Sequence, residues 1–157
     1  MFTKGDKIVY PMHGAGIIEE IEEKKILGEI RKYYILNVPC GEMKIMIPVD
    51  SSKEIGIRAI VSDEELAQAI DILREKSSEM SANWNRRYRE NMEKLKTGDV
   101  LEVAEVIRNL MRTDREKKLS TGEKKMLTNA RQILSSEIIL IKGIDMKEAN
   151  SIIDRAV

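Results

Sequence analysis

The residues best suited to binding a charged ligand lie in one stretch, SANWNRRYRENMEKL, at residues 81–95. This stretch holds the single tryptophan of the chain, Trp84, together with Arg86, Arg87, Tyr88 and Arg89. Arginine side chains neutralise phosphate groups, and a bulky side chain beside them can wedge between the base steps of a nucleic acid. The residue types therefore favour a ligand that presents phosphates next to an apolar surface.

A structural interpretation of the same residues also fits. Trp84, Tyr88, Met92 and Leu95 recur at the spacing of one helix face, which is typical of residues that face a core. In that case Trp84 is simply the first core residue of a helix. Against this, Trp84 stands at the start of the predicted helix, where a side chain can project past its neighbours. Periodicity alone leaves both interpretations open.

The charge of the chain is unevenly distributed, although its net charge is zero. Residues 84–131 carry thirteen basic and eight acidic side chains, whereas residues 63–83 carry two basic and six acidic ones. A basic centre can face phosphates. The segment RTDREKK at 112–118 and the pair Lys124–Lys125 could extend it, although each, taken alone, is better explained as a solvated helix face.

Residues for enzymatic chemistry are sparse. The single histidine, His13, and the single cysteine, Cys40, each lie in a turn-like segment, and nothing in the spacing brings them together as a nucleophile and its base. No metal-ligand cluster, phosphate-binding loop or dinucleotide fingerprint is present in the sequence. The sequence therefore argues against an enzyme, and no cofactor or metal is expected. A carboxylate pair assembled only by the fold would leave no such pattern.

Residues 1–61 are predicted to form a small β-domain. Apolar residues alternate in KYYILNV at 32–38 and in MKIMI at 43–47, which is the period of a strand with one buried face. About four short strands are expected, with a fifth near IRAI at 57–60. So short an all-β segment can bury a core as a small SH3-like or Tudor-like barrel.

Residues 62–157 are predicted to form an all-α bundle of five helices. From Ser62 onward the apolar period is helical, and the segments SDEE, DVLE, STGE and DMKE each place a capping side chain before a helix. No apolar run approaches the roughly 20 residues of a membrane span, and the start of the chain does not resemble a secretory signal. A two-domain cytoplasmic protein is therefore expected.

Three segments resemble the CarD/CdnL family of bacterial RNA polymerase-binding transcription regulators. They are GDKIVYPMHGAGIIEEIE, NWNRRYRENMEKLKTGDVLEVAEVIRNL and LSTGEKKMLTNARQIL, and the resemblance extends through essentially the whole chain. The first segment is also similar to a module of the transcription-repair coupling factor. The resemblance implies that the Tudor-like domain docks on the lobe of the polymerase β subunit. It also implies that the helical domain contacts the backbone and minor groove of promoter DNA at the upstream edge of the melted region.

The resemblance also implies roles for individual residues. Trp84 matches the family's tryptophan, which wedges into the minor groove and helps to hold the open complex. Phosphate contacts are carried onto Arg86, Arg87, Arg89 and Lys124. Tyr88 is also counted among the DNA-binding residues, with a second role open to it, which is to pack under the tryptophan and support it.

The polymerase-contact positions depart from the family pattern. Arginines of the family correspond here to Lys24, which keeps the charge but loses the guanidinium fork, and to Met46, which keeps neither. Contact at Met46 would have to be apolar or made by the strand backbone, whose exposed edge could pair with a polymerase strand. The protein is expected to act as a monomer, located at the nucleoid through RNA polymerase. The alternative function is a polymerase-binding adaptor with no direct DNA contact.

Overall fold

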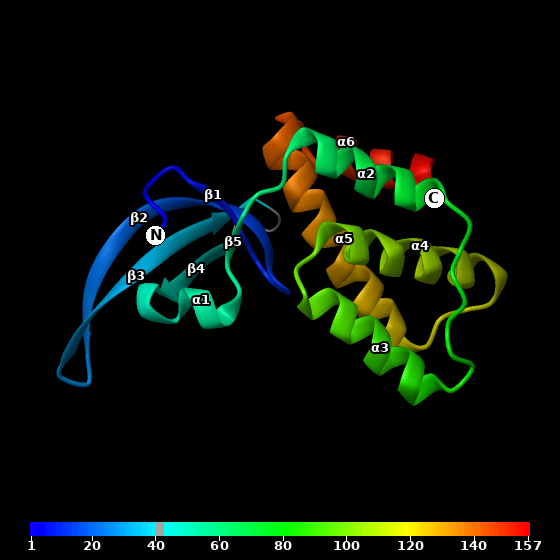
Figure 1. Ribbon diagram of the computed structural model, residues 1–157, viewed down its shortest axis with the longest axis horizontal. Coiled ribbons are helices and arrows are strands. Elements are labelled where there is room, and N and C mark those ends of the chain that lie inside the picture. Colours follow the sequence, from blue (N-terminus) through cyan, green and yellow to red (C-terminus); the bar gives the residue numbers. More distant parts are fainter. Residues whose placement is uncertain (40–42) are drawn as a thin grey trace.

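The computed structural model describes residues 1–39 and 43–157, so Cys40 lies outside the described residues. An antiparallel five-stranded sheet comes first, in the strand order β4-β3-β2-β1-β5. It is curved, and the hairpin of its two longest strands extends away from the helices (Figure 1). The strands are β1 (Lys7–Tyr10), β2 (Gly14–Ile26), β3 (Glu29–Val38), β4 (Met43–Pro48) and β5 (Arg58–Ala59).

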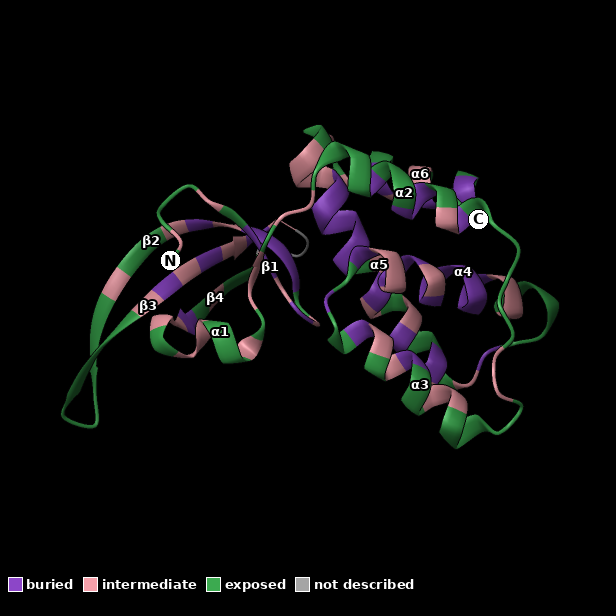
Figure 2. Ribbon diagram, in the orientation of Figure 1, coloured by how far each residue is buried: buried purple, intermediate pink, exposed green. Residues whose placement is uncertain are grey.

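Side-chain alternation explains which face of the sheet is buried. In β3, Tyr34, Leu36 and Val38 are buried, as the period-two pattern predicts, while the residues between them are not (Figure 2). On the face of β4 that holds Met43, Ile45 and Ile47, burial increases along the strand, from an exposed Met43 to a buried Ile47. The resulting small core contains Ile8, Ile18, Tyr34, Leu36, Val38 and Ile47.

The helices follow the predicted order, and the predicted fold class is confirmed. Residues 62–157 hold α2 (Asp63–Arg74), α3 (Trp84–Lys96), α4 (Val100–Glu116), α5 (Thr121–Lys142) and α6 (Met146–Ala156). Ser62, Asp99, Ser120 and Asp145 each cap a helix with a side-chain oxygen, as the sequence predicts. Among the described helices none is long and apolar enough to cross a membrane.

A short helix between β4 and β5 was not predicted. Helix α1 (Ser52–Ile55) is four residues long and follows a 3-10 turn at Val49–Ser51. One helical turn is too short to show a 3.6-residue period, which is why the sequence pattern did not reveal it. The described chain therefore has six helices rather than five, with the additional one beside the sheet (Figure 1).

The sheet and the helices meet through hydrogen bonds to buried polar groups of α5. The backbone N–H of Ala15 in β2 donates to Ser136 Oγ at 2.7 Å. From β5, Arg58 donates to Glu137 Oε1 at 2.7 Å and to the carbonyl of Gly98 at 2.8 Å. Because Gly98 lies two residues after the end of α3, Arg58 ties both α3 and α5 to the sheet.

Replacement of Gly16 by alanine is expected to destabilise the sheet. A Cβ atom at this buried position of β2 would lie 2.6 Å from the carbonyl oxygen of Asn37 and 2.8 Å from Leu36 Cγ, so the paired strands would have to separate. We expect a loss of about 2 kcal/mol in the free energy of unfolding, measured by urea denaturation. Gly28→Ala, at the open hairpin tip, is the control and should cost about 1 kcal/mol through its positive φ alone. Equal losses would contradict the steric explanation.

Candidate nucleic-acid interface

Helix α3 carries its apolar stripe from a buried end to an exposed one. Leu95, near the C-terminus, is 1% exposed, whereas Trp84, the first residue, is 42% exposed. The stripe faces the core near the end that Arg58 ties to the sheet and emerges at the opposite end. The core interpretation therefore describes Leu95, while Trp84 lies on the surface.

Contacts from two helices fix the orientation of the Trp84 ring. It stacks on Tyr88, one helical turn later, with ring centroids 5.1 Å apart and planes 19° from parallel. Its Nε1–H donates to Ser120 Oγ, the N-cap of α5, at 2.9 Å. Gly122 lies against both rings, since a Cβ there would be 3.5 Å from an atom of each. An exposed tryptophan held in this way keeps apolar surface in one orientation.

Ser120 also belongs to a buried ionic network. Its hydroxyl donates to Glu123 Oε1 at 3.1 Å, and Glu123 accepts two hydrogen bonds from Arg87, at 2.9 Å and 3.3 Å. The guanidinium of Arg87 also donates to the carbonyl of Ser81 at 3.1 Å. Mainly through these hydrogen bonds, Arg87 holds the pKa of the Glu123 carboxyl below its usual range, so the carboxylate stays ionised.

The predicted phosphate contacts divide into two kinds in the structure. Arg86, Arg89 and Lys124 are exposed. Arg86 pairs with Glu90 at 2.9 Å across one turn of α3; within the described chain the side chains of Arg89 and Lys124 have no ionic partner. The side chain of Arg87, by contrast, is 16% exposed and bound to Glu123. Three of the four cations lie within five residues of Trp84 on α3, and Lys124 lies four residues after its partner Ser120 on α5; only Arg87 is not exposed.

The predicted polymerase contacts lie on the same face of the sheet. Lys24 pairs with Arg31, and Met46 pairs with Ile35. Cross-strand partners share a face, as do residues four apart in one strand, so Lys24 and Met46 lie on the same face, opposite the core residues of β3. Both are exposed. Strand β4 ends the described sheet order, which leaves its outer edge without a partner strand there.

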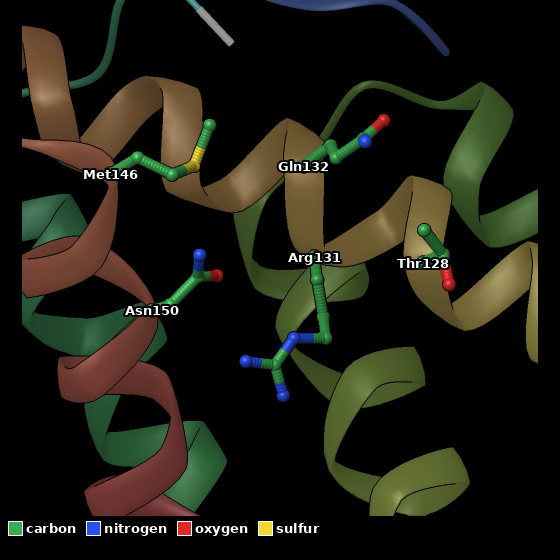
Figure 3. Close-up of a pocket in the computed structure, with 5 residues that line it drawn as sticks. All are labelled: Thr128, Arg131, Gln132, Met146 and Asn150. Carbon is green, nitrogen blue, oxygen red and sulfur yellow. The ribbon is translucent and has the colours of Figure 1, made fainter. Parts of the chain in front are cut away.

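Among the residues that the structure describes, the remaining candidates do not assemble into a cluster of metal ligands. His13 is exposed and stacks obliquely on Tyr10, with ring centroids 4.2 Å apart, and Cys40 is not among the described residues. No group of acids, histidines and cysteines in the described chain is placed to hold a metal ion. A hollow between α5 and α6 (Figure 3) is lined by Thr128, Arg131, Gln132, Met146 and Asn150. Its cation, Arg131, already pairs with Asp154 at 2.8 Å.

Comparison with known proteins agrees with both halves of this description. Residues 2–61 match the family model of the CarD-like/TRCF RID domain, and residues 68–154 match that of the CarD C-terminal domain. The chain belongs to the CarD family. A relative from Bacillus subtilis (strain 168), named "Putative transcription factor YdeB", is 45% identical over 151 residues. The match covers 96% of this chain and 99% of the relative.

Three residues around the tryptophan were not predicted from the sequence to belong to the site. Ser120 was predicted only as a helix cap, and neither Glu123 nor Gly122 was given a role at the site. A glutamate three residues after a serine cap indicates a capping box, so the sequence suggested a partner on its own helix. The structure shows that the Glu123 carboxylate accepts from the Ser120 hydroxyl and, in addition, pairs with Arg87 of α3. Only the packing of α3 against α5 reveals this partner.

Proposed function

We propose that this member of the CarD family is a transcription regulator that binds the RNA polymerase β subunit and stabilises the promoter open complex. Residues 1–61 form the polymerase-interacting domain, which docks on the β lobe through the face that carries Lys24 and Met46. Residues 62–157 form the DNA-contacting domain. The protein acts as a cytoplasmic monomer, without a cofactor or catalysis of its own.

The observation that carries this proposal is the exposed, oriented Trp84 beside exposed cations. Its ring is set by Tyr88 and Ser120, and three nearby cations point to solvent. Cations that neutralise phosphates, combined with an apolar wedge, are the features of minor-groove binding without base-specific readout. The sheet provides the contact with the polymerase. A protein held on the polymerase presents its wedge to DNA at high local concentration.

The mechanism is thermodynamic. Contacts made only with the partly or fully melted promoter shift the equilibrium from the closed to the open complex. A shift of about 1.4 kcal/mol changes this ratio about tenfold. A wedge with two or three phosphate contacts is sufficient for an effect of this size.

Neutralising an exposed cation tests the DNA contact directly. We expect Arg89→Ala and Lys124→Ala each to shorten the open-complex lifetime and to reduce the slope of its logarithm against log salt by about one, because each removes one phosphate contact. The lifetime is measured at several salt concentrations with the matching polymerase holoenzyme. Lys147→Ala, an exposed lysine of α6, is the matched control and should leave the slope unchanged. Unchanged lifetimes with normal polymerase binding would instead support the adaptor with no DNA contact.

A further inference from the structure

We infer that Arg87 is a positioning residue, which holds Trp84 in its orientation through Glu123 and Ser120 instead of contacting DNA itself. The inference rests on the proposed function for its consequence at the promoter. Its physical basis is the network that joins the start of α3 to the start of α5.

The first link of this network is the hydroxyl of Ser120, which has one proton and two lone pairs. It donates the proton to Glu123 Oε1 at 3.1 Å, and it accepts from Trp84 Nε1 at 2.9 Å and from the backbone N–H of Glu123 at 3.2 Å. All three positions of the hydroxyl are thereby used. Because the ionised carboxylate only accepts, it fixes the direction of the Ser120 proton and leaves a lone pair for the indole.

The second link is the Glu123 carboxylate, whose position depends on Arg87. Glu123 is 3% exposed, so it requires a charged partner inside the protein. Two nitrogens of the Arg87 fork bind its two oxygens, and the third nitrogen binds the carbonyls of Ser81 and Ala82. Arg87 thus secures both the carboxylate and the chain segment that leads into Trp84. A lysine could not make these contacts together, because its ammonium group lacks the planar fork.

Arg87 differs from the neighbouring Arg86 in its exposure and in its partner. The side chain of Arg86 is 68% exposed, and its partner Glu90 is also on the surface. A phosphate can compete for such a guanidinium at little cost. Removing Arg87 from Glu123 would instead leave a buried carboxylate unpaired. Arg86 and Arg87 are adjacent in sequence, but Arg86 is available to a phosphate, whereas Arg87 is held by Glu123.

Two carboxamide substitutions separate the positioning role from a simple charge effect. Glu123→Gln and Glu90→Gln each remove one negative charge beside an arginine of α3. If charge alone matters, both changes strengthen DNA contact and lengthen the open-complex lifetime. If Glu123 positions the ring, Glu123→Gln shortens the lifetime toward that of Trp84→Ala, because the carboxamide can donate to Ser120 Oγ and compete with the indole. Glu90→Gln then leaves the lifetime unchanged or longer.

The free protein provides a readout that does not depend on promoter function. Trp84 is the single tryptophan, so fluorescence anisotropy decay and acrylamide quenching report its mobility and exposure alone. Glu123→Gln, Arg87→Met and Arg87→Lys are each expected to speed the decay and raise quenching. Arg86→Ala and Glu90→Gln should change neither. Should Glu123→Gln fail to fold, Ser120→Gly removes the indole acceptor while keeping most of the capping energy.

The outcomes separate the two proposals. Faster ring motion in the Arg87 and Glu123 variants upholds the positioning role, even if wild-type protein has no effect on open-complex lifetime and the proposed function is wrong. If ring motion is unchanged in these variants, the positioning role is wrong. If Arg87→Met also lowers the salt slope by about one, as Arg89→Ala is expected to do, Arg87 is a phosphate contact.

Discussion

Replacement of Trp84 by alanine is expected to abolish the lengthening of open-complex lifetime while leaving polymerase binding intact. The change removes the ring that would enter the minor groove but no part of the polymerase-docking face. A loss of about tenfold in lifetime corresponds to about 1.4 kcal/mol. The measurement uses a promoter that melts poorly, the matching holoenzyme, and wild-type or variant protein at concentrations that saturate the polymerase.

Two aromatic variants serve as controls for this prediction. Trp84→Phe keeps an apolar ring but loses the bond to Ser120, so we expect an intermediate lifetime. Tyr88→Phe keeps the ring on which Trp84 stacks and should behave as wild type. Thermal unfolding checks that the variants still fold, as we expect because Trp84 is largely outside the core. Equal lifetimes for wild type and Trp84→Ala would make Trp84 a scaffold residue and leave the adaptor function as the better explanation.

Much of the scaffold around the tryptophan was predictable from the sequence, because local chemistry determines it. Capping side chains such as Ser62 and Ser120 satisfy backbone N–H groups within their own helix, so their positions predict the helix starts directly. Alternating apolar residues in β3 likewise predict its buried face. Trp84 is the first residue of α3, in agreement with its predicted place at the start of a helix, but periodicity alone did not predict that its side chain is exposed.

The partners of the individual arginines were not predictable in the same way. Arg87 and Arg89 are two positions apart, which places them on different sides of a helix, but the sequence does not say which side faces α5. The distinction depends on how α3 packs against α5, a tertiary property. A clue to the other tertiary contact was present in SSE at 135–137, where three polar residues interrupt the otherwise apolar run ILSSEIILI at 133–141. All three are buried, and two of them meet the sheet.

The joint between the sheet and the helices matters to the proposed mechanism because the two predicted binding surfaces lie at opposite ends of the molecule. The polymerase-docking face belongs to the sheet, while Trp84 lies about 20 Å from the sheet-facing end of α3, given a rise of 1.5 Å per residue. A wedge can stabilise melted DNA only if the docked sheet holds it in position. Arg58 contacts both Gly98 and Glu137, so it connects the sheet to the two helices that carry the site.

Replacement of Arg58 by alanine is expected to lower the free energy of unfolding by about 3 kcal/mol at neutral pH, because it leaves a buried carboxylate without its partner. The Glu137 side chain is 1% exposed, and that of Arg58 is 27% exposed. Urea denaturation measures the loss. Arg74→Ala, which removes an exposed pair with Asp71, is the control and should change stability by less than about 0.5 kcal/mol.

The loss caused by Arg58→Ala should depend on pH in a definite direction. Burial raises the pKa of the Glu137 carboxyl; the charge and hydrogen bond of Arg58 oppose that rise, while Glu65 and Asp99 add to it. Without Arg58 the pKa rises further. The folded variant then binds a proton more readily than the unfolded chain, so its stability falls as pH increases through the raised pKa. The difference from wild type is therefore larger at about pH 8 than at about pH 5.

A second substitution isolates the carboxylate as the cause. In the Arg58→Ala background, Glu137→Gln replaces the unpaired charge with a neutral amide of similar size, so it should recover a large part of the lost stability and remove the pH dependence. If the double variant is as unstable as Arg58→Ala, the loss comes from the bond to Gly98 or from packing. In that case Arg58 acts by orienting α3 and not by neutralising the Glu137 carboxylate of α5. Open-complex lifetime measured on the double variant would then show whether a stable but loosened joint still presents Trp84 to promoter DNA.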